Sequence, residues 1–394
     1  MFSSRKRFLS AYFTLSPNAL FVKGTDAWKR VFPFTSPHGA WTFSGRVALY
    51  CGLRQIRLRP GSTILVPSYF QGTEIDTLIA AGYKLRYYEL DHNFEVDLTD
   101  VEQKVDSDVS ALYIIHYFGL PQRLALISSF CQSKDIKLIE DCALSFLSAE
   151  GEMMLGSQGD IALFSIYKSV PLPHGGYVVT KDPAESSQLQ SPPFYSTVLQ
   201  TADLVAQYIR GISAHGILNR VWNRTQGVRK GIADKTVVSG TITLDPQTLC
   251  YSASNVVPHL MRLADPHFVI ERRRANFALL HSKLGHLSAL KIDSLPQGAC
   301  PLFYPIVVDD KPCFRANLLH RGIGSVNLWS QPHLASPCEG TPQVAKWRNT
   351  ILELPIHQQL DGNDVERVAH EVLHLTRRTP IQRPASKVIA GVAG

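Results

Sequence analysis

Short apolar stretches alternate with longer amphipathic ones from Trp41 onward. The apolar stretches are rich in β-branched or aromatic residues, and the amphipathic ones place apolar residues three or four positions apart. This rhythm is typical of βα units that build a mainly parallel sheet. It predicts strands at residues 63–66, 84–89, 111–116, 137–140, 161–165 and 177–180, and helices that begin near Gly45, Gln71 and Leu124.

The second half of the chain has a different pattern. Residues 183–238 look helical and carry cations that suit either a solvated helix face or an anion site. These cations are Arg210, Arg220, Arg224, Arg229 and Lys230. Farther on, we expect a helix with the run RRRAN (272–276), short strands at 302–308 and a last helix from about Asp364.

These patterns divide the chain into four parts. We expect an N-terminal surface arm or first helix at 1–40, a large α/β domain at 41–245, a small α+β domain at 246–378 and a flexible tail at 379–394. The fold class is therefore α/β, with a doubly wound large domain.

Composition narrows the possible functions. With 394 residues, 45% of them hydrophobic, the chain can bury a large core. The formal charge of +7 favours an anionic ligand, but the cations are scattered, so we expect no nucleic-acid partner. Seven widely spaced cysteines indicate free thiols in the cytoplasm and no metal site. The first residues lack the long apolar stretch of a membrane anchor.

A predicted strand ends in two carboxylates within LIEDCA, residues 138–143. Open α/β sheets bind their ligands at the carboxyl ends of their strands. An acid there, such as Asp141, could keep a pyridine nitrogen protonated, so that the ring accepts electrons from a breaking bond. Alternatively, Glu140 or Asp141 caps the next helix.

One lysine follows the strand at 161–165, and a glycine pair, Gly175 and Gly176, comes after it. A lysine that forms a Schiff base must come from a short rigid segment beside the sheet, and Lys168 has that setting. Ser165 could donate its hydroxyl to a cofactor phosphate. A lone lysine after a strand can equally be a solvated side chain.

Two further fragments suit a cofactor. A predicted helix begins at Ser44, Gly45 and Arg46, and its N-terminal amides attract phosphate, although Ser44 could be an ordinary N-cap. Tyr69 and Phe70 follow another strand, where either ring could stack on a cofactor or simply fill the core.

In order and spacing, these four fragments resemble the DegT/DnrJ/StrS sugar aminotransferases, a family with the aspartate aminotransferase-like fold (fold type I) that depends on pyridoxal phosphate (PLP). The segments SGRVALYCGL, IIHYFGLPQ, LIEDCA, ERRRANFALL and LELPIHQQLDGNDVERV carry the likeness, from about Trp41 to Arg377. The resemblance implies that Lys168 forms the Schiff base, that Asp141 binds the pyridine nitrogen and that Ser165 and Gly45 bind the phosphate.

The resemblance also implies an activity. We expect an amino group to pass from an amino acid, glutamate by family likeness, to a nucleotide-linked keto sugar in polysaccharide or secondary-metabolite biosynthesis. A homodimer with its active sites at the subunit boundary is implied as well. Trp329, His333 and His357 lie in loops that could form the sugar side of the pocket, although such residues are more often structural.

Some residues depart from the family pattern. Leu144 stands where Gln or His is common, Arg46 stands where threonine is usual, and the spacer between Ser165 and Lys168 is short. Two alternatives therefore stay open: a PLP-dependent sugar dehydratase, in which the nearby His174 would matter, and a non-catalytic relative.

Overall fold

The computed structural model describes residues 7–18, 24–56, 58–182, 189–212, 248–336 and 341–378. The strands are β1 (Gly39–Thr42), β2 (Thr63–Pro67), β3 (Lys84–Tyr88), β4 (Val109–Ile115), β5 (Lys137–Asp141), β6 (Ala149–Glu150), β7 (Met153–Met154), β8 (Ile161–Ser165), β9 (Gly176–Thr180), β10 (Phe303–Val307) and β11 (Ile351–Pro355). The α-helices are α1 (Gly45–Gln55), α2 (Thr73–Ala80), α3 (Leu98–Lys104), α4 (Leu124–Ser133), α5 (Phe194–Ile212), α7 (Val256–Met261), α8 (Pro266–Leu284), α9 (Lys311–His320), α10 (Pro342–Thr350) and α11 (Gly362–Arg378). Short 3₁₀ helices are η2 (Ala27–Arg30), η3 (Tyr117–Gly119), η4 (Ile166–Lys168), η6 (Thr248–Cys250) and η7 (Gly285–Leu287).

A seven-stranded sheet in the order β1-β9-β8-β5-β4-β2-β3 forms the centre of the large domain. Only β9 runs against its neighbours, β8 and β1, and the other paired strands are parallel. The mainly parallel α/β sheet expected from the sequence is therefore confirmed. Because the strands are buried on both faces, they read as nearly continuous apolar runs.

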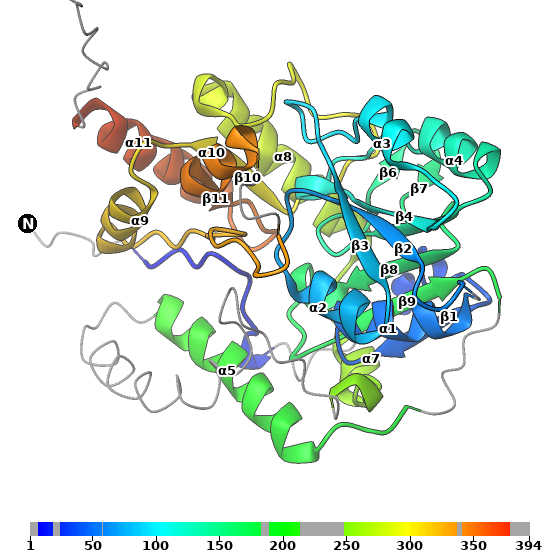
Figure 1. Ribbon diagram of the computed structural model, residues 1–394. Helices are drawn as coiled ribbons and strands as arrows, with labels where there is room; N and C mark the ends of the chain where they lie inside the picture. Colours follow the sequence, from blue (N-terminus) through cyan, green and yellow to red (C-terminus); the bar gives the residue numbers. More distant parts are fainter. Residues whose placement is uncertain are drawn as a thin grey trace, which may run out of the picture.

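The carboxyl ends of the parallel strands meet at one edge of this sheet, where β5 ends at Asp141 and β8 ends at Ser165. The antiparallel β9 begins at the same edge with Gly176, which pairs with Ser165. Helix α1 packs across β8 and β9, and its first turn lies at this edge (Figure 1). Residues from four separate segments are thus brought together.

β10 pairs with β11 in antiparallel register, and α8 packs against β10 and α11. We use the name small domain for the part of the chain from α8 to α11. These elements lie to one side of the large sheet (Figure 1). The expected helix around 272–276 is α8, the short strands expected at 302–308 are the single strand β10, and the last helix is α11. Most of the predicted helical region at 183–238, including Arg220, Arg224, Arg229 and Lys230, lies outside the described residues, as does the tail.

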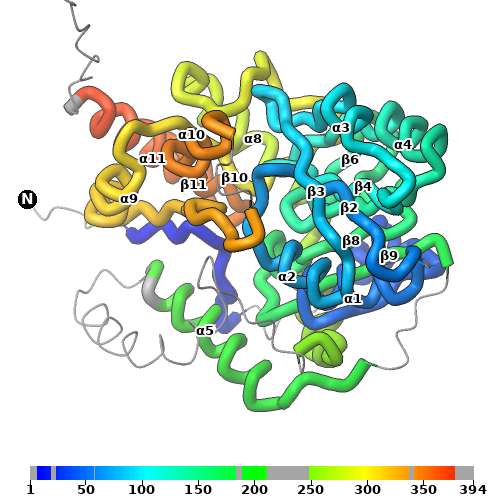
Figure 2. The backbone as a smooth tube through the Cα atoms, in the orientation of Figure 1, coloured from blue at the N-terminus to red at the C-terminus, as the bar shows by residue number. Residues whose placement is uncertain are grey.

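The N-terminal arm is more than a surface segment. In Figure 2 it runs from the large domain to α9 and α11. Leu9, Phe13 and Leu15 are buried, and Leu9 forms an isolated parallel bridge with Ile323 in the small domain. The sequence analysis missed this docking because the apolar residues of the arm follow no helical or strand period. No helix among the described residues is long and apolar enough to cross a membrane.

Candidate active site

Asp141 lies at the carboxyl end of β5 with 7% of its surface exposed. The Tyr113 hydroxyl donates to its Oδ2 at 2.5 Å, and the Ala143 amide donates to its Oδ1 at 2.8 Å. Each carboxylate oxygen is therefore held by one donor, and the side chain has a fixed orientation. The alternative that Asp141 caps the next helix is not supported, because no helix begins directly after β5.

The pKa of Asp141 depends on its burial and on the charged and polar groups around it. Burial and, next in size, the charge of Glu74 raise the pKa of Asp141, and the net value is about 6. The Tyr113 hydrogen bond, the Ala143 amide and the Lys168 ammonium each lower the pKa. Lys168 sits at the end of η4 and is half-buried. The structure thus brings the Lys168 ammonium within electrostatic range of the Asp141 carboxylate.

A narrow cradle lies between the start of α1 and the ends of β8 and β9. A side chain on Gly45 would collide with the Ser165 hydroxyl, and one on Gly176 would collide with the Ser44 carbonyl. The Ser44 hydroxyl accepts from the Val47 amide at 3.4 Å, so its N-cap role is real. The first turn of α1 therefore lies beside Ser165, and backbone amides at a helix N-terminus can bind phosphate.

Arg46 supports the same interpretation. Its Nε is buried and has no hydrogen-bond partner. A buried guanidinium nitrogen without an acceptor is costly, and an anion at the helix N-terminus would satisfy it. The orphaned donor and the glycine-lined cradle fit the phosphate of PLP, while Asp141 and Lys168 fit its ring and its aldehyde.

Tyr69 and Phe70 are both fully buried. The Tyr69 ring lies 4.7 Å from Trp329, and the Arg348 guanidinium lies 5.6 Å from Tyr69 and 5.4 Å from Phe70. Arg348 also donates to the Phe70 carbonyl at 3.1 Å. These contacts join the segment after β2 to the small domain and favour the packing alternative. Stacking of either ring on the cofactor stays a prediction.

Glu140, beside Asp141, has a structural role. Its carboxylate accepts from the amides of Gly156, Gln158 and Gly159 at 2.7, 2.9 and 2.5 Å. His116 Nε2 lies 3.1 Å from Glu140 Oε2, and His116 Nδ1 accepts from the Gln122 amide. Donor atoms of His116, Glu140 and Cys142 lie within 4.8 Å of one another, but hydrogen bonds already engage those of His116 and Glu140. This cluster does not favour a metal site.

His174 is not placed to act as a base. Its Nε2 accepts from the Ser254 amide at 3.1 Å, so Nδ1 carries the proton and donates to Gln200 Oε1 at 3.2 Å. The ring stacks on Phe43 with centroids 4.5 Å apart. Burial lowers the pKa of His174, and the Gln200 hydrogen bond opposes this shift. The structure therefore gives no support to a dehydratase in which His174 moves protons.

The other uncertain residues have packing or hydrogen-bond contacts. Leu144 is buried in the core. Trp329 belongs to the aromatic cluster around Tyr69, and His333 Nε2 lies 2.8 Å from Asp76 Oδ1. His357 Nε2 lies 3.2 Å from the Ser10 carbonyl of the arm. These contacts agree with the structural interpretation of the three loop residues.

The sequence analysis missed Tyr113 and Glu74. Tyr113 lies within the apolar run of β4, where alternation gave no sign that its hydroxyl reaches the neighbouring strand. Glu74 lies in the first turn of α2 and accepts from the Gln71 amide at 2.8 Å, like an ordinary helix-capping acid. Only the tertiary structure brings both residues to Asp141.

A half-buried lysine within electrostatic range of a buried acid, on a mainly parallel α/β sheet, is the arrangement expected of a PLP-dependent aminotransferase of fold type I. Residues 34–373 match the sequence profile of the DegT/DnrJ/EryC1/StrS aminotransferase family, and the chain belongs to this family.

Similar proteins agree with this assignment. A dTDP-4-dehydro-2,3,6-trideoxy-D-glucose 4-aminotransferase from Saccharopolyspora spinosa is 24% identical, and the alignment covers 86% of each chain. A GDP-perosamine synthase from Escherichia coli O157:H7 is 28% identical over 35% of this chain and 39% of that protein. A putative sugar aminotransferase from Streptococcus pneumoniae, solved in its PMP form, has a TM-score of 0.63 at 15% identity and covers 93% of this chain and 94% of that one.

Proposed function

We propose that the protein transfers an amino group from glutamate to a keto sugar carried on a nucleotide, with Lys168 and Asp141 as its catalytic residues. The observation that carries this proposal is the placement of the Lys168 ammonium within electrostatic range of a buried, firmly oriented Asp141. The substrate class is supported by the relative that aligns over 86% of both chains, which is named for a dTDP-linked dehydro sugar.

Each residue has a distinct task in this proposal. Lys168 would hold the cofactor, and its amine would move the proton from Cα of the amino donor. Asp141 would hold the pyridine nitrogen of the cofactor with its negative charge, and Tyr113 and Ala143 keep its oxygens in place. Ser165, Ser44, Gly45 and Arg46 bind the phosphate. Bound PLP supplies the electron sink that stabilises the carbanion at Cα.

The activity is tested in two steps. Incubation of the PLP-loaded protein with ¹⁵N-labelled glutamate is expected to convert the cofactor to its amino form and to release 2-oxoglutarate. Addition of a nucleotide-linked keto sugar should then produce a ¹⁵N-labelled amino sugar, detected by mass spectrometry. Label that reaches the cofactor but no keto sugar would contradict the acceptor, whereas a cofactor that never takes up label would contradict the donor.

The proposed phosphate site at Gly45 and Ser165 can be tested separately. In Gly45→Ala, the added methyl group must displace the Ser165 hydroxyl, so PLP affinity is expected to fall about tenfold or more. Equilibrium titration of the apoprotein with PLP measures this. Gly362→Ala is the matched control, because Gly362 also begins a helix but a methyl group there would meet no atom within 4 Å. Equal affinities for the two variants would contradict the proposed phosphate site.

We also propose that the protein works as a homodimer in the cytoplasm. Helix α5 exposes Phe194 by 78% and Tyr195 by 69%, with Val198, Leu199 and Ile209 exposed along the same helix. So large an apolar surface favours a protein partner, and a second copy agrees with the family. Leu199→Asp should shift the mass in solution from dimer to monomer, measured by light scattering. A monomeric unsubstituted protein with full activity would exclude the dimer.

A further inference from the structure

The turn that carries Lys168 is held by the small domain. Ser169 is buried, and its carbonyl oxygen accepts two hydrogen bonds, one from Arg273 Nη2 at 3.0 Å and one from Gln358 Nε2 at 3.1 Å. Arg273 lies on α8, and Gln358 follows β11. The backbone next to the lysine is therefore attached to elements that lie far along the chain.

These two side chains also bind each other, because Arg273 Nε donates to Gln358 Oε1 at 3.1 Å. This bond orients the Gln358 amide so that its NH₂ group faces Ser169. Arg273 is 1% exposed, and its two acceptors, Gln358 Oε1 and the Ser169 carbonyl oxygen, are neutral. Apolar side chains could fill this space without the cost of burying a cation, so the ring of hydrogen bonds suggests a role in orientation.

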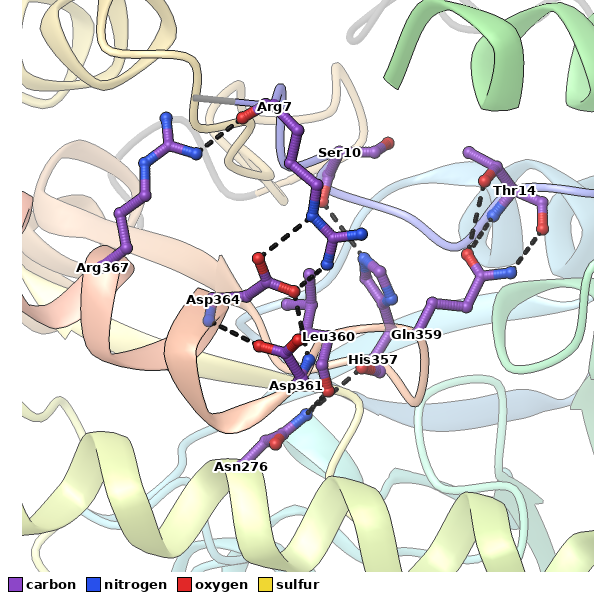
Figure 3. A network of polar contacts seen from close by, with 10 residues as sticks. All are labelled: Arg7, Ser10, Thr14, Asn276, His357, Gln359, Leu360, Asp361, Asp364 and Arg367. Atoms are coloured by element: carbon purple, nitrogen blue, oxygen red, sulfur yellow. Dashed lines mark hydrogen bonds and ion pairs between the residues drawn. The ribbon is translucent and has the colours of Figure 1, made fainter. Parts of the chain in front are cut away.

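The N-terminal arm covers the same ring. Phe13 lies 6.0 Å from the Arg273 guanidinium and edge-on to His357, with centroids 6.3 Å apart. Figure 3 shows how His357 contacts the arm at Ser10 and how Gln359 exchanges hydrogen bonds with the Thr14 backbone. Residues 357 and 359 thus hold the arm, while Gln358 between them holds the lysine turn.

We propose that Arg273 and Gln358 are positioning residues for Lys168. They fix the backbone at Ser169 so that the lysine amine faces the Asp141 pocket, and they link this placement to the docked small domain and arm. This inference rests on the proposed function, because it assumes that Lys168 is the residue that reacts with PLP.

The sharpest test is Gln358→Glu with Gln359→Glu as its matched control. Gln358→Glu keeps the volume and adds an ion pair with Arg273, but it replaces the donor that faces the Ser169 carbonyl with an acceptor. Gln359→Glu makes the same chemical change one residue along and removes a donor to the Thr14 carbonyl instead. Thermal unfolding of both variants checks that they fold.

The main readout needs no substrate: the first-order rate at which apoprotein forms its covalent bond with saturating PLP, followed by the visible absorption band. In Gln358→Glu, we expect this rate to fall on the order of 10- to 100-fold. We expect kcat to fall by a similar factor, with KM nearly unchanged. In Gln359→Glu, both the rate and kcat should stay within about twofold. Should Gln358→Glu not fold, Gln358→Met against Gln359→Met makes the same comparison.

Equal rates in folded variants at 358 and 359 would overturn the positioning role. Failure of the proposed function would look different, because the unsubstituted protein would then form no PLP bond at Lys168, or would form one and transfer no amino group.

Discussion

Lys168→Ala is expected to lose the visible band of bound PLP and to lower the transamination rate by about 10⁴-fold or more. The variant lacks both the amine that bonds to the cofactor and the base that moves the proton. PLP should still bind non-covalently through the cradle at Gly45 and Ser165. Absorbance spectra before and after borohydride reduction, with a single-turnover assay on glutamate, measure both effects.

Lys181→Ala is the control for this experiment. Lys181 follows the same sheet after β9, but its ammonium is paired with Asp160 at 3.2 Å. It should keep the visible band and the rate of the unsubstituted protein. If Lys168→Ala still retained covalent cofactor after reduction, another lysine would be the reactive one and our assignment would be wrong.

Asp141→Asn is expected to lower the transamination rate about a thousandfold while PLP remains attached to Lys168. Asparagine keeps the size of the side chain and can still contact Tyr113 and Ala143, but it has no charge to keep the pyridine nitrogen protonated. The ¹⁵N chemical shift of ring-labelled PLP reports that protonation directly. Asp160→Asn, at the opposite end of β8, should leave both the shift and the rate unchanged.

Although Asp141→Asn should lower the rate, the same substitution should make the protein without cofactor more stable above about pH 7. The pKa of Asp141 is raised to about 6 in the folded chain, so the folded state binds more protons than the unfolded state between about pH 4 and 6. The free energy of unfolding therefore falls as pH rises through this interval, by about 3 kcal/mol at most. Above about pH 7, apo Asp141→Asn should melt at a higher temperature than the unsubstituted apoprotein. At about pH 4, the two melting temperatures should be nearly equal.

Much of the large domain could be predicted because its strands are buried on both faces. β8 begins and ends where the apolar run at 161–165 does, and β5 extends the predicted strand by Asp141 alone. The short edge strand β1 was missed, since its four residues include a glycine and show no apolar run. The arm was underestimated because its burial depends on contacts with the small domain, such as the bridge from Leu9 to Ile323.

Some residues of the candidate site could be predicted from the sequence and others could not. Asp141 and Ser165 end neighbouring strands, and Lys168 follows within three residues, so parallel-sheet geometry alone predicts their proximity. Tyr113, Glu74, Arg273 and Gln358 could not be assigned from the sequence, because their partners lie on other elements. For Tyr69 and Phe70, in contrast, the sequence suggested more than the contacts support. Aromatic residues at a strand end can stack on a cofactor, but the described neighbours of these two are core side chains and Arg348.

The most direct test of the central claim is to reduce the PLP-loaded, unsubstituted protein with borohydride, digest it and locate the modified residue by mass spectrometry. Our account predicts a single phosphopyridoxyl group, on the peptide that contains Lys168. A cofactor fixed to any other lysine, or released intact after reduction, would contradict it.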